Sequence, residues 1–198
     1  YNADDPKIKL KIHHTYRVAA LCERIAKAAG MCAYDVELAW LSGMLHDVGR
    51  FEQIKRYNTF TDADSVDHAK FGADLLFKDG LISTFLNGMV KCTGYKSGAL
   101  EDRYSSDGVF LYDRLNKSDM EMLELAIRCH NMYRIPQGLN SREQAFCNVL
   151  RDADKVDIFK VNIDTPLEEI YNTTTEDLKK SYITDQVIKA FDEQHSIL

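Results

Sequence analysis

The sequence is short of the features that mark membrane-spanning, disulfide-bonded and zinc-knuckle proteins. It has 3 prolines and 5 cysteines in 198 residues, and no two cysteines form a C-x-x-C pair. Scattered cysteines in odd number argue against a disulfide framework and predict a reduced, cytoplasmic compartment. No apolar run approaches the roughly 20 residues that cross a bilayer, and no signal peptide is visible. Because the sequence begins at Tyr1 rather than methionine, we expect further residues to precede it.

Basic residues are also too few for a broad polyanion-binding surface. The chain has 25 Lys and Arg against 31 Asp and Glu, for a net charge of −6. Nucleic-acid polymers and anionic membranes need clustered Lys and Arg, so neither is an expected partner. A small phosphorylated substrate stays compatible with this charge, because a local basic pocket can lie inside an acidic protein. The oligomeric state is left open, a homodimer being one option.

Alternation of apolar and polar residues, the mark of strands, is absent, whereas helical spacing recurs throughout. Caps and apolar periodicity predict eight helices. The first four are expected over 7–29, from the cap Asp35 to a stop at Gly49, from the cap Ser65 past Leu76, and over 82–92. The other four are expected to start at the capping box Ser118–Glu121, at Ser141, at Pro166 and at Thr184. The glycine- and serine-rich stretch within 93–117 is expected to be a surface excursion and a candidate lid. The fold class is therefore all-α. We expect one domain over 1–198, with a catalytic core at about 7–160 and a helical extension over 161–198.

Candidate metal ligands recur along these helices in the order H…HD…H…H…D. Successive predicted helices carry one or two each: His14, His46 with Asp47, His68, His130 and Asp154. Metal sites in helical bundles are commonly built from side chains on facing helices. Imidazole mixed with carboxylate favours Mn, Fe, Co, Ni or Zn over Mg. The sequence therefore predicts a divalent transition-metal site of one or two ions in the core.

The adjacent His46 and Asp47 set a geometric condition. Neighbouring side chains of a helix point in different directions. The pair can therefore serve one ion only near a frayed helix end, or serve two ions between them. Gly49, just beyond, fits such a distortion.

Two stretches carry a family resemblance that extends over about Lys7 to Phe159. Leu45-His46-Asp47-Val48-Gly49-Arg50 resembles the H-D-[IV]-G-[KR] element of the HD superfamily of metal-dependent phosphohydrolases, and Ala153-Asp154-Lys155 resembles its last ligand. The resemblance implies an HD-domain helical bundle in which one ion is bound by His14, His46, Asp47 and Asp154. His68 and His130 would complete a second site, with Asp47 bridging. Asp152 competes with Asp154 for the last position, and we favour Asp154 for its sequence context.

The resemblance also implies an activity. We expect hydrolysis of a phosphoester or phosphoanhydride bond by metal-activated water, in a small phosphorylated substrate, with a nucleotide as the leading candidate. Asp47 and Arg50 are the expected catalytic residues. Arg17, Arg50 and Lys155 are the candidate substrate contacts.

Two other functions remain open at the level of sequence. The same ligand order occurs in HD-fold di-iron oxygenases that resemble myo-inositol oxygenase, and nothing in the ligand pattern separates the two chemistries. A nucleotide-sensing HD module without fast turnover is the other alternative, although an intact ligand set argues against it. The HD-GYP branch fits poorly, because His130-Asn131-Met132 stands where that branch has His-His-Glu.

Overall fold

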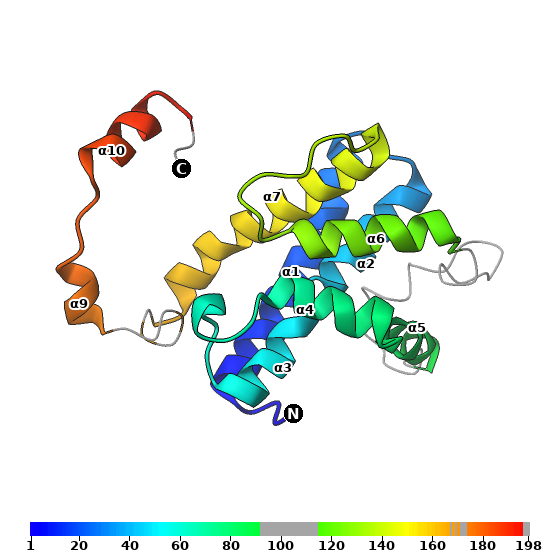
Figure 1. The fold of residues 1–198 in the computed structure, drawn as a ribbon, viewed down its shortest axis with the longest axis horizontal. Helices are drawn as coiled ribbons and strands as arrows, with labels where there is room; N and C mark the ends of the chain where they lie inside the picture. Colours follow the sequence, from blue (N-terminus) through cyan, green and yellow to red (C-terminus); the bar gives the residue numbers. More distant parts are fainter. Residues whose placement is uncertain (92–114, 167, 169, 171–173, 196–198) are drawn as a thin grey trace. The chain divides into compact units, whose positions relative to one another are not determined.

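The computed structural model describes residues 1–91, 115–166, 168, 170 and 174–195. These residues contain helices and connecting segments but no strand, which confirms the all-α prediction (Figure 1). Two compact units divide the chain, Tyr1–Val161 and Asn162–Leu198. Whether 1–198 behaves as one domain stays a prediction.

Most of the helices lie in the first unit. In chain order they are α1 (Pro6–Ala28), α2 (Ala33–Leu45), α3 (Val48–Tyr57), the 3-10 turn η1 (Asp62–Asp64), α4 (His68–Ala73), its π-helical continuation η2 (Asp74–Lys78), α5 (Leu81–Lys91), α6 (Lys117–Cys129) and α7 (Ser141–Asp164). The last of these runs past Val161 into the second unit. That unit also holds α9 (Thr175–Lys179) and α10 (Asp185–Asp192).

A close crossing of α1 and α2 positions the first part of the site. A Cβ atom built on Gly43 would lie 2.6 Å from the Cα of Ala19, so the two backbones approach as only glycine permits. His14 lies on α1 and His46 directly follows α2. The crossing therefore brings two candidate ligands from distant parts of the sequence to one place.

The contact between α3 and α4 is closer still. A Cβ atom on Gly49 would lie 2.2 Å from the carbonyl oxygen of His68 and 2.8 Å from the backbone nitrogen of Gly72. The prediction that Gly49 ends a helix is wrong, because this residue lies inside α3. Its function is to allow the start of α4, which carries His68, to lie directly against α3.

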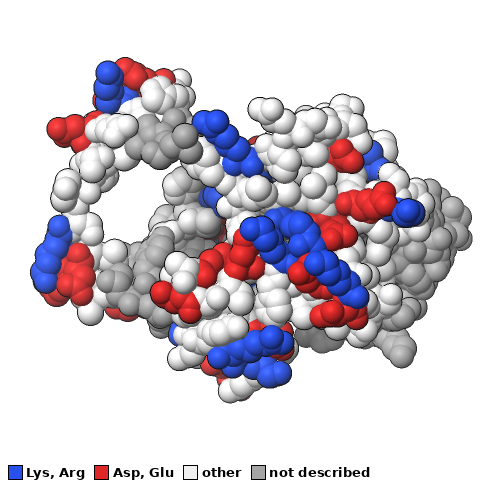
Figure 2. Space-filling model, viewed as in Figure 1, with Lys and Arg blue, Asp and Glu red and all other residues white. Residues whose placement is uncertain are grey.

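The apolar faces of α2, α6 and α7 supply most of the largest fully buried apolar side chains, and η2 adds Leu76: Leu38, Leu41, Leu45, Leu76, Leu123, Ile127, Phe146 and Leu150. Acidic and basic side chains are interspersed over the described surface that faces the viewer in Figure 2.

Several predicted caps were displaced by a few residues. The N-cap of α4 is Asp67 rather than Ser65, and its side chain accepts from the backbone N–H of Lys70. At α6 the capping box joins Asn116 and Asp119, so the predicted pair Ser118–Glu121 was wrong. These N-caps satisfy N–H groups that have no partner within the helix.

Two further starts also differ from the prediction. The N-cap of α2 is Cys32, and Asp35 lies in the first turn of the helix. The carboxylate of Asp35 accepts hydrogen bonds from Arg142 instead of capping the helix. At α7 the side chain of Asn140, rather than Ser141, accepts from the first backbone N–H groups. The Thr184 start is confirmed as the N-cap of α10. The predicted excursion over 93–117 and the helix from Pro166 fall largely outside the described residues.

Candidate metal centre

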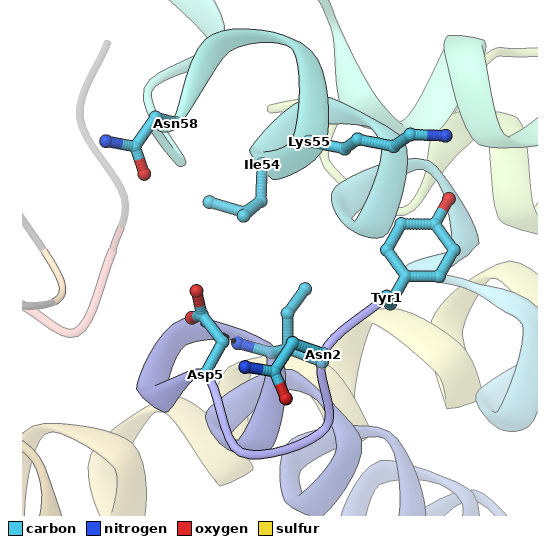
Figure 3. Close-up of a pocket in the computed structure, with 7 residues that line it drawn as sticks. Tyr1, Asn2, Asp5, Ile54, Lys55 and Asn58 are labelled. Carbon is cyan, nitrogen blue, oxygen red and sulfur yellow. Dashed lines mark hydrogen bonds between the residues drawn. The ribbon is translucent and has the colours of Figure 1, made fainter.

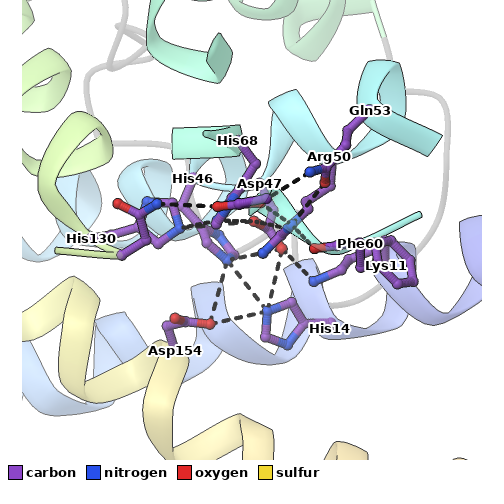
Figure 4. A network of polar contacts seen from close by, with 12 residues as sticks. Lys11, His14, His46, Asp47, Arg50, Gln53, Phe60, His68, His130 and Asp154 are labelled. Carbon is purple, nitrogen blue, oxygen red and sulfur yellow. Dashed lines mark hydrogen bonds and ion pairs between the residues drawn. The ribbon is translucent and has the colours of Figure 1, made fainter. Parts of the chain in front are cut away.

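The chain changes direction at His46 and Asp47, which form the two-residue break between α2 and α3. His46 keeps helical angles, whereas Asp47 has φ −103° and ψ 16° and leaves the helical path. Both side chains are buried, with 0% and 2% of each residue exposed. The break meets the condition that the sequence imposed, since adjacent residues here point into one site (Figure 4).

One group of ligand atoms forms around Oδ2 of Asp47. This oxygen lies 3.6 Å from Nε2 of His14 and 3.6 Å from Nε2 of His46, and the two nitrogens are 3.4 Å apart. From α7, Oδ1 of Asp154 lies 3.2 Å from Nε2 of His14 and 3.9 Å from Nε2 of His46. Asp154 therefore lies close to both histidines of this group, and its role as a fourth ligand stays a prediction.

A second group forms around the other oxygen of the same carboxylate. Oδ1 of Asp47 lies 3.5 Å from Nε2 of His68 and 3.8 Å from Nε2 of His130, and these nitrogens are 3.1 Å apart. Each group brings three ligand atoms within metal-binding reach of one another. Asp47 therefore faces both groups, and all six predicted ligands come together in one buried cluster.

Hydrogen bonds on the outer side of the rings orient all four imidazoles. The Nδ1 atoms of His46 and His130 lie 2.7 Å from the carbonyl oxygens of Gly43 and Ile127. A carbonyl only accepts, so these Nδ1 atoms carry hydrogen and, in the neutral ring, Nε2 presents its lone pair to the cluster.

The other two imidazoles rest on carboxylates. Nδ1 of His14 lies 2.7 Å from Asp157, and Nδ1 of His68 lies 2.6 Å from Asp62. A carboxylate behind a metal-binding histidine fixes the ring and increases the basicity of its inner nitrogen. Sequence reasoning missed both aspartates.

The electrostatics favour ligand-competent protonation states at most positions. Burial lowers the pKa of His46 and lowers that of His130 to about 3. Burial alone would raise the pKa of Asp47, but Lys11 and the neighbouring imidazoles hold it well below its ordinary value. Burial alone would also raise the pKa of Asp154, but the hydrogen bond with His14, together with His46 and Lys155, lowers it. Neutral imidazoles and ionised carboxylates are the forms that bind metals.

His14 is the exception. Burial lowers its pKa, but hydrogen bonds to Asp154 and Asp157 outweigh that effect and raise it. A proton on this ring offsets part of the negative charge of the carboxylates. A bound cation would take over this role and displace the proton.

The donor set fits a transition-metal ion. Neutral His46 and His130 present lone pairs toward the Nε2 atoms of His14 and His68, at 3.4 Å and 3.1 Å. Opposed lone pairs repel each other unless a proton or a cation lies between them, and a buried site offers no bulk water to screen them. Imidazole with carboxylate suits Mn, Fe, Co, Ni or Zn. We conclude that the cluster can hold divalent metal ions.

The predicted cations lie around this cluster in different ways. Arg17 is bound by two nitrogens to Asp157, at 2.6 Å and 2.9 Å. Arg50 donates through Nη1 to three acceptors, and its buried Nε, which lacks a hydrogen-bond partner, lies 3.7 Å from Oδ1 of Asp47. Lys155 is half exposed and contacts Oδ2 of Asp154. Their roles toward a substrate stay predictions.

The structure also bears on the choice between Asp152 and Asp154, and it places Lys11 next to the cluster. Asp152 is exposed, whereas Asp154 is buried against His14, so the geometry favours Asp154. Lys11 contacts Oδ2 of Asp47 at 2.8 Å, although sequence reasoning did not single it out. Its position three residues before His14 is the signal that could have identified it.

A separate pocket between the N-terminal segment and α3 contains none of these ligands (Figure 3). It is lined by Tyr1, Asn2, Asp5, Ile8, Ile54, Lys55 and Asn58. Its mixed surface has no cluster of metal-binding groups, so the cluster around Asp47 is the stronger functional candidate.

Comparisons with known proteins agree with the geometry. The HD domain family matches residues 12–195, which include all six clustered ligands. No curated protein and no solved structure matches the chain. Among the described residues, no helix is long and apolar enough to cross a membrane. The match covers most of the chain, and the chain therefore belongs to the HD domain family.

Proposed function

We propose that the protein is a metal-dependent phosphohydrolase that cleaves a phosphoester or phosphoanhydride bond, with a nucleotide as the expected substrate. The observation that carries this proposal is the position of Asp47, which offers one oxygen to each of two buried groups of ligands. Membership of the HD domain family supports the reaction class. Fold alone does not fix the chemistry, so the proposal needs an activity test.

In the proposed mechanism, the residues of the chain hold and orient. His14, His46 and Asp154 would hold one ion, His68 and His130 a second, and Asp47 both. When bound, divalent ions lower the pKa of water toward about 7 and neutralise phosphoryl oxygens. Burial of all six side chains limits access of bulk water and strengthens electrostatic interactions inside the cluster.

Arg50 supplies fixed positive charge next to the second group. Its Nη1 is anchored to Gln53, to the carbonyl oxygen of Phe60 and to Asp62, which holds the guanidinium beside Asp47. A preorganised cation stabilises charge that develops on a phosphoryl group without reorienting during the reaction.

The test starts with the metal content of protein purified without added metal, followed by a panel of phosphorylated nucleotides with Mn, Co or Ni. We expect phosphate release that a chelator abolishes. Asp47→Asn should reduce this release at least about 100-fold, because it removes the negative charge that both groups share and replaces one of the two oxygens by an NH2 group that does not bind metals. Asp152→Asn is the matched control, since this exposed aspartate lies near Asp154 in sequence but outside the cluster.

Two outcomes would contradict the proposal. Iron-loaded protein that consumes dioxygen, without phosphate release under any metal, would assign the cluster to oxygenase chemistry. Metal-dependent nucleotide binding with no turnover across the panel would assign it to sensing.

A further inference from the structure

Lys11 places an ammonium group at the edge of the first group of ligands. It lies on α1 three residues before His14, so the two side chains share a helix face. Its Nζ is 2.8 Å from Oδ2 of Asp47, the oxygen that faces His14 and His46. The side chain is 14% exposed, so the ammonium is largely shielded yet retains access to solvent. Figure 4 shows it approaching the cluster beside Phe60.

This ammonium has donors to spare. A lysine ammonium carries three N–H groups, and among the described residues Asp47 is the single hydrogen-bond acceptor that Lys11 contacts. The Phe60 ring flanks Nζ at 5.2 Å and restrains its position. Two N–H groups are thus available, next to the oxygen expected to bind an ion.

The three cations predicted from the sequence, Arg17, Arg50 and Lys155, are placed or bound differently from Lys11. Arg17 lies on the Nδ1 side of His14, away from the inner Nε2, and both of its contacting nitrogens are bound to Asp157. Arg50 is anchored by Nη1 on the Oδ1 side of Asp47. Lys155 contacts the oxygen of Asp154 that does not face the histidines. Lys11 therefore combines proximity to the first group with spare donors.

We propose that Lys11 binds a non-bridging phosphoryl oxygen of the substrate. A lysine acts as a compact point charge with rotatable donors, which suits a phosphoryl oxygen arriving at a neighbouring ion. The partly buried position strengthens this attraction relative to an exposed lysine. The inference rests on the proposed function and names the residue that recognises the phosphoryl group.

The test measures binding of inorganic phosphate to Mn-loaded protein by calorimetry, with Mn affinity measured in parallel. Lys11→Met keeps the apolar stem and removes the charge, and Lys11→Arg keeps the charge. Lys9→Met is the matched control, because Lys9 is exposed on the same helix. We expect Lys11→Met to weaken phosphate binding about tenfold or more. Mn should bind unchanged or tighter, because a competing cation has gone, and Lys9→Met should match wild type.

Different results separate this inference from the proposed function. Equal phosphate affinity in wild type and Lys11→Met, with metal-dependent hydrolysis intact, would overturn the role of Lys11 alone. Weakened Mn binding with unchanged phosphate affinity would make Lys11 a residue that only positions Asp47, which also overturns it. If Mn-loaded wild type neither binds phosphate nor releases it from any nucleotide, both proposals fall. Retention of phosphate affinity by Lys11→Arg would support the charge-based contact.

Discussion

At the scale of single residues, the outer partner of each imidazole determines what its inner nitrogen can do. In each of the two groups, one histidine donates to a carboxylate and the other to a backbone carbonyl. The carboxylates are Asp157, which also pairs with Arg17, and Asp62, which also accepts from Arg50. Both groups therefore have the same design, with one imidazole held by a carboxylate and one held by a backbone carbonyl.

This design predicts site-selective effects on metal binding. Asp157→Asn should weaken binding at the His14 group, and Asp62→Asn should weaken binding at the His68 group, each by about 10- to 100-fold. Calorimetric titration with Mn, which resolves two classes of site, measures the effect. Asp152→Asn is the control and should bind as wild type does. Equal weakening of both sites by either substitution would show that the two groups are not tuned independently.

The six candidate ligands could be selected from the sequence because each lies in a patterned helix or in a recognisable motif. Asp62 could not, because it lies in the short turn η1 between α3 and α4, and its contact with His68, six residues later, depends on how that connection folds. Asp157 lies three residues after Asp154 on α7, but spacing alone does not reveal that it contacts α1. Both contacts depend on how the chain packs, which a single sequence does not display.

At the scale of elements, the break after α2 explains the largest difference between expectation and structure. The sequence indicated a helix ending at Gly49, whereas the chain turns at His46 and resumes as α3. A glycine signals both a helix end and a close backbone approach, so the residue type alone cannot distinguish them. The neighbouring backbone of α4 makes the distinction.

Gly49→Ala should therefore damage the metal centre through packing. The added methyl group would overlap the carbonyl oxygen of His68, so α4 must move away from α3. We expect a loss of about 1–3 kcal/mol in the free energy of unfolding, together with weaker binding at the second group. Urea unfolding and Mn titration check both effects. Ala20→Gly, at an exposed position of α1, is the control. It should lower the free energy of unfolding by about 1 kcal/mol and leave Mn binding intact. An equal loss of Mn binding in Ala20→Gly would contradict the packing argument.

A second element-scale prediction concerns acid stability. Asp119, which is buried, joins α6 to α2 and α7 by accepting from Tyr34 and Arg142. Burial favours its neutral form, but these hydrogen bonds outweigh burial and hold its pKa below the ordinary value. As the pH falls, Asp119 is therefore protonated in the unfolded state before it is protonated in the folded state. The stabilisation is complete above the ordinary pKa of about 4 and is lost as the pH falls toward the depressed one.

Asp119→Asn tests the predicted loss of stability at low pH. At neutral pH it should unfold more easily by about 1–3 kcal/mol, because the charge-assisted bonds are lost. Between about pH 7 and pH 3.5 its stability should then fall less steeply than that of wild type. Urea unfolding at both pH values gives the difference, with the exposed Asp152→Asn as the control. Parallel pH dependence in wild type and Asp119→Asn would contradict the assignment.

At the scale of the whole molecule, the complete centre lies within one compact unit. All six candidate ligands and the two aspartates behind them are in Tyr1–Val161, although the family match extends to residue 195. Truncation after Asp164, where α7 ends, should therefore leave the centre intact. We expect the same Mn stoichiometry and an affinity within about twofold of the full chain, because the truncated chain keeps all six candidate ligands and the carboxylates behind them. Calorimetric titration of both chains, with circular dichroism to verify the fold, makes the comparison. A folded truncated chain that has lost one Mn site would show that residues beyond 164 belong to the centre, and would favour a single domain over 1–198.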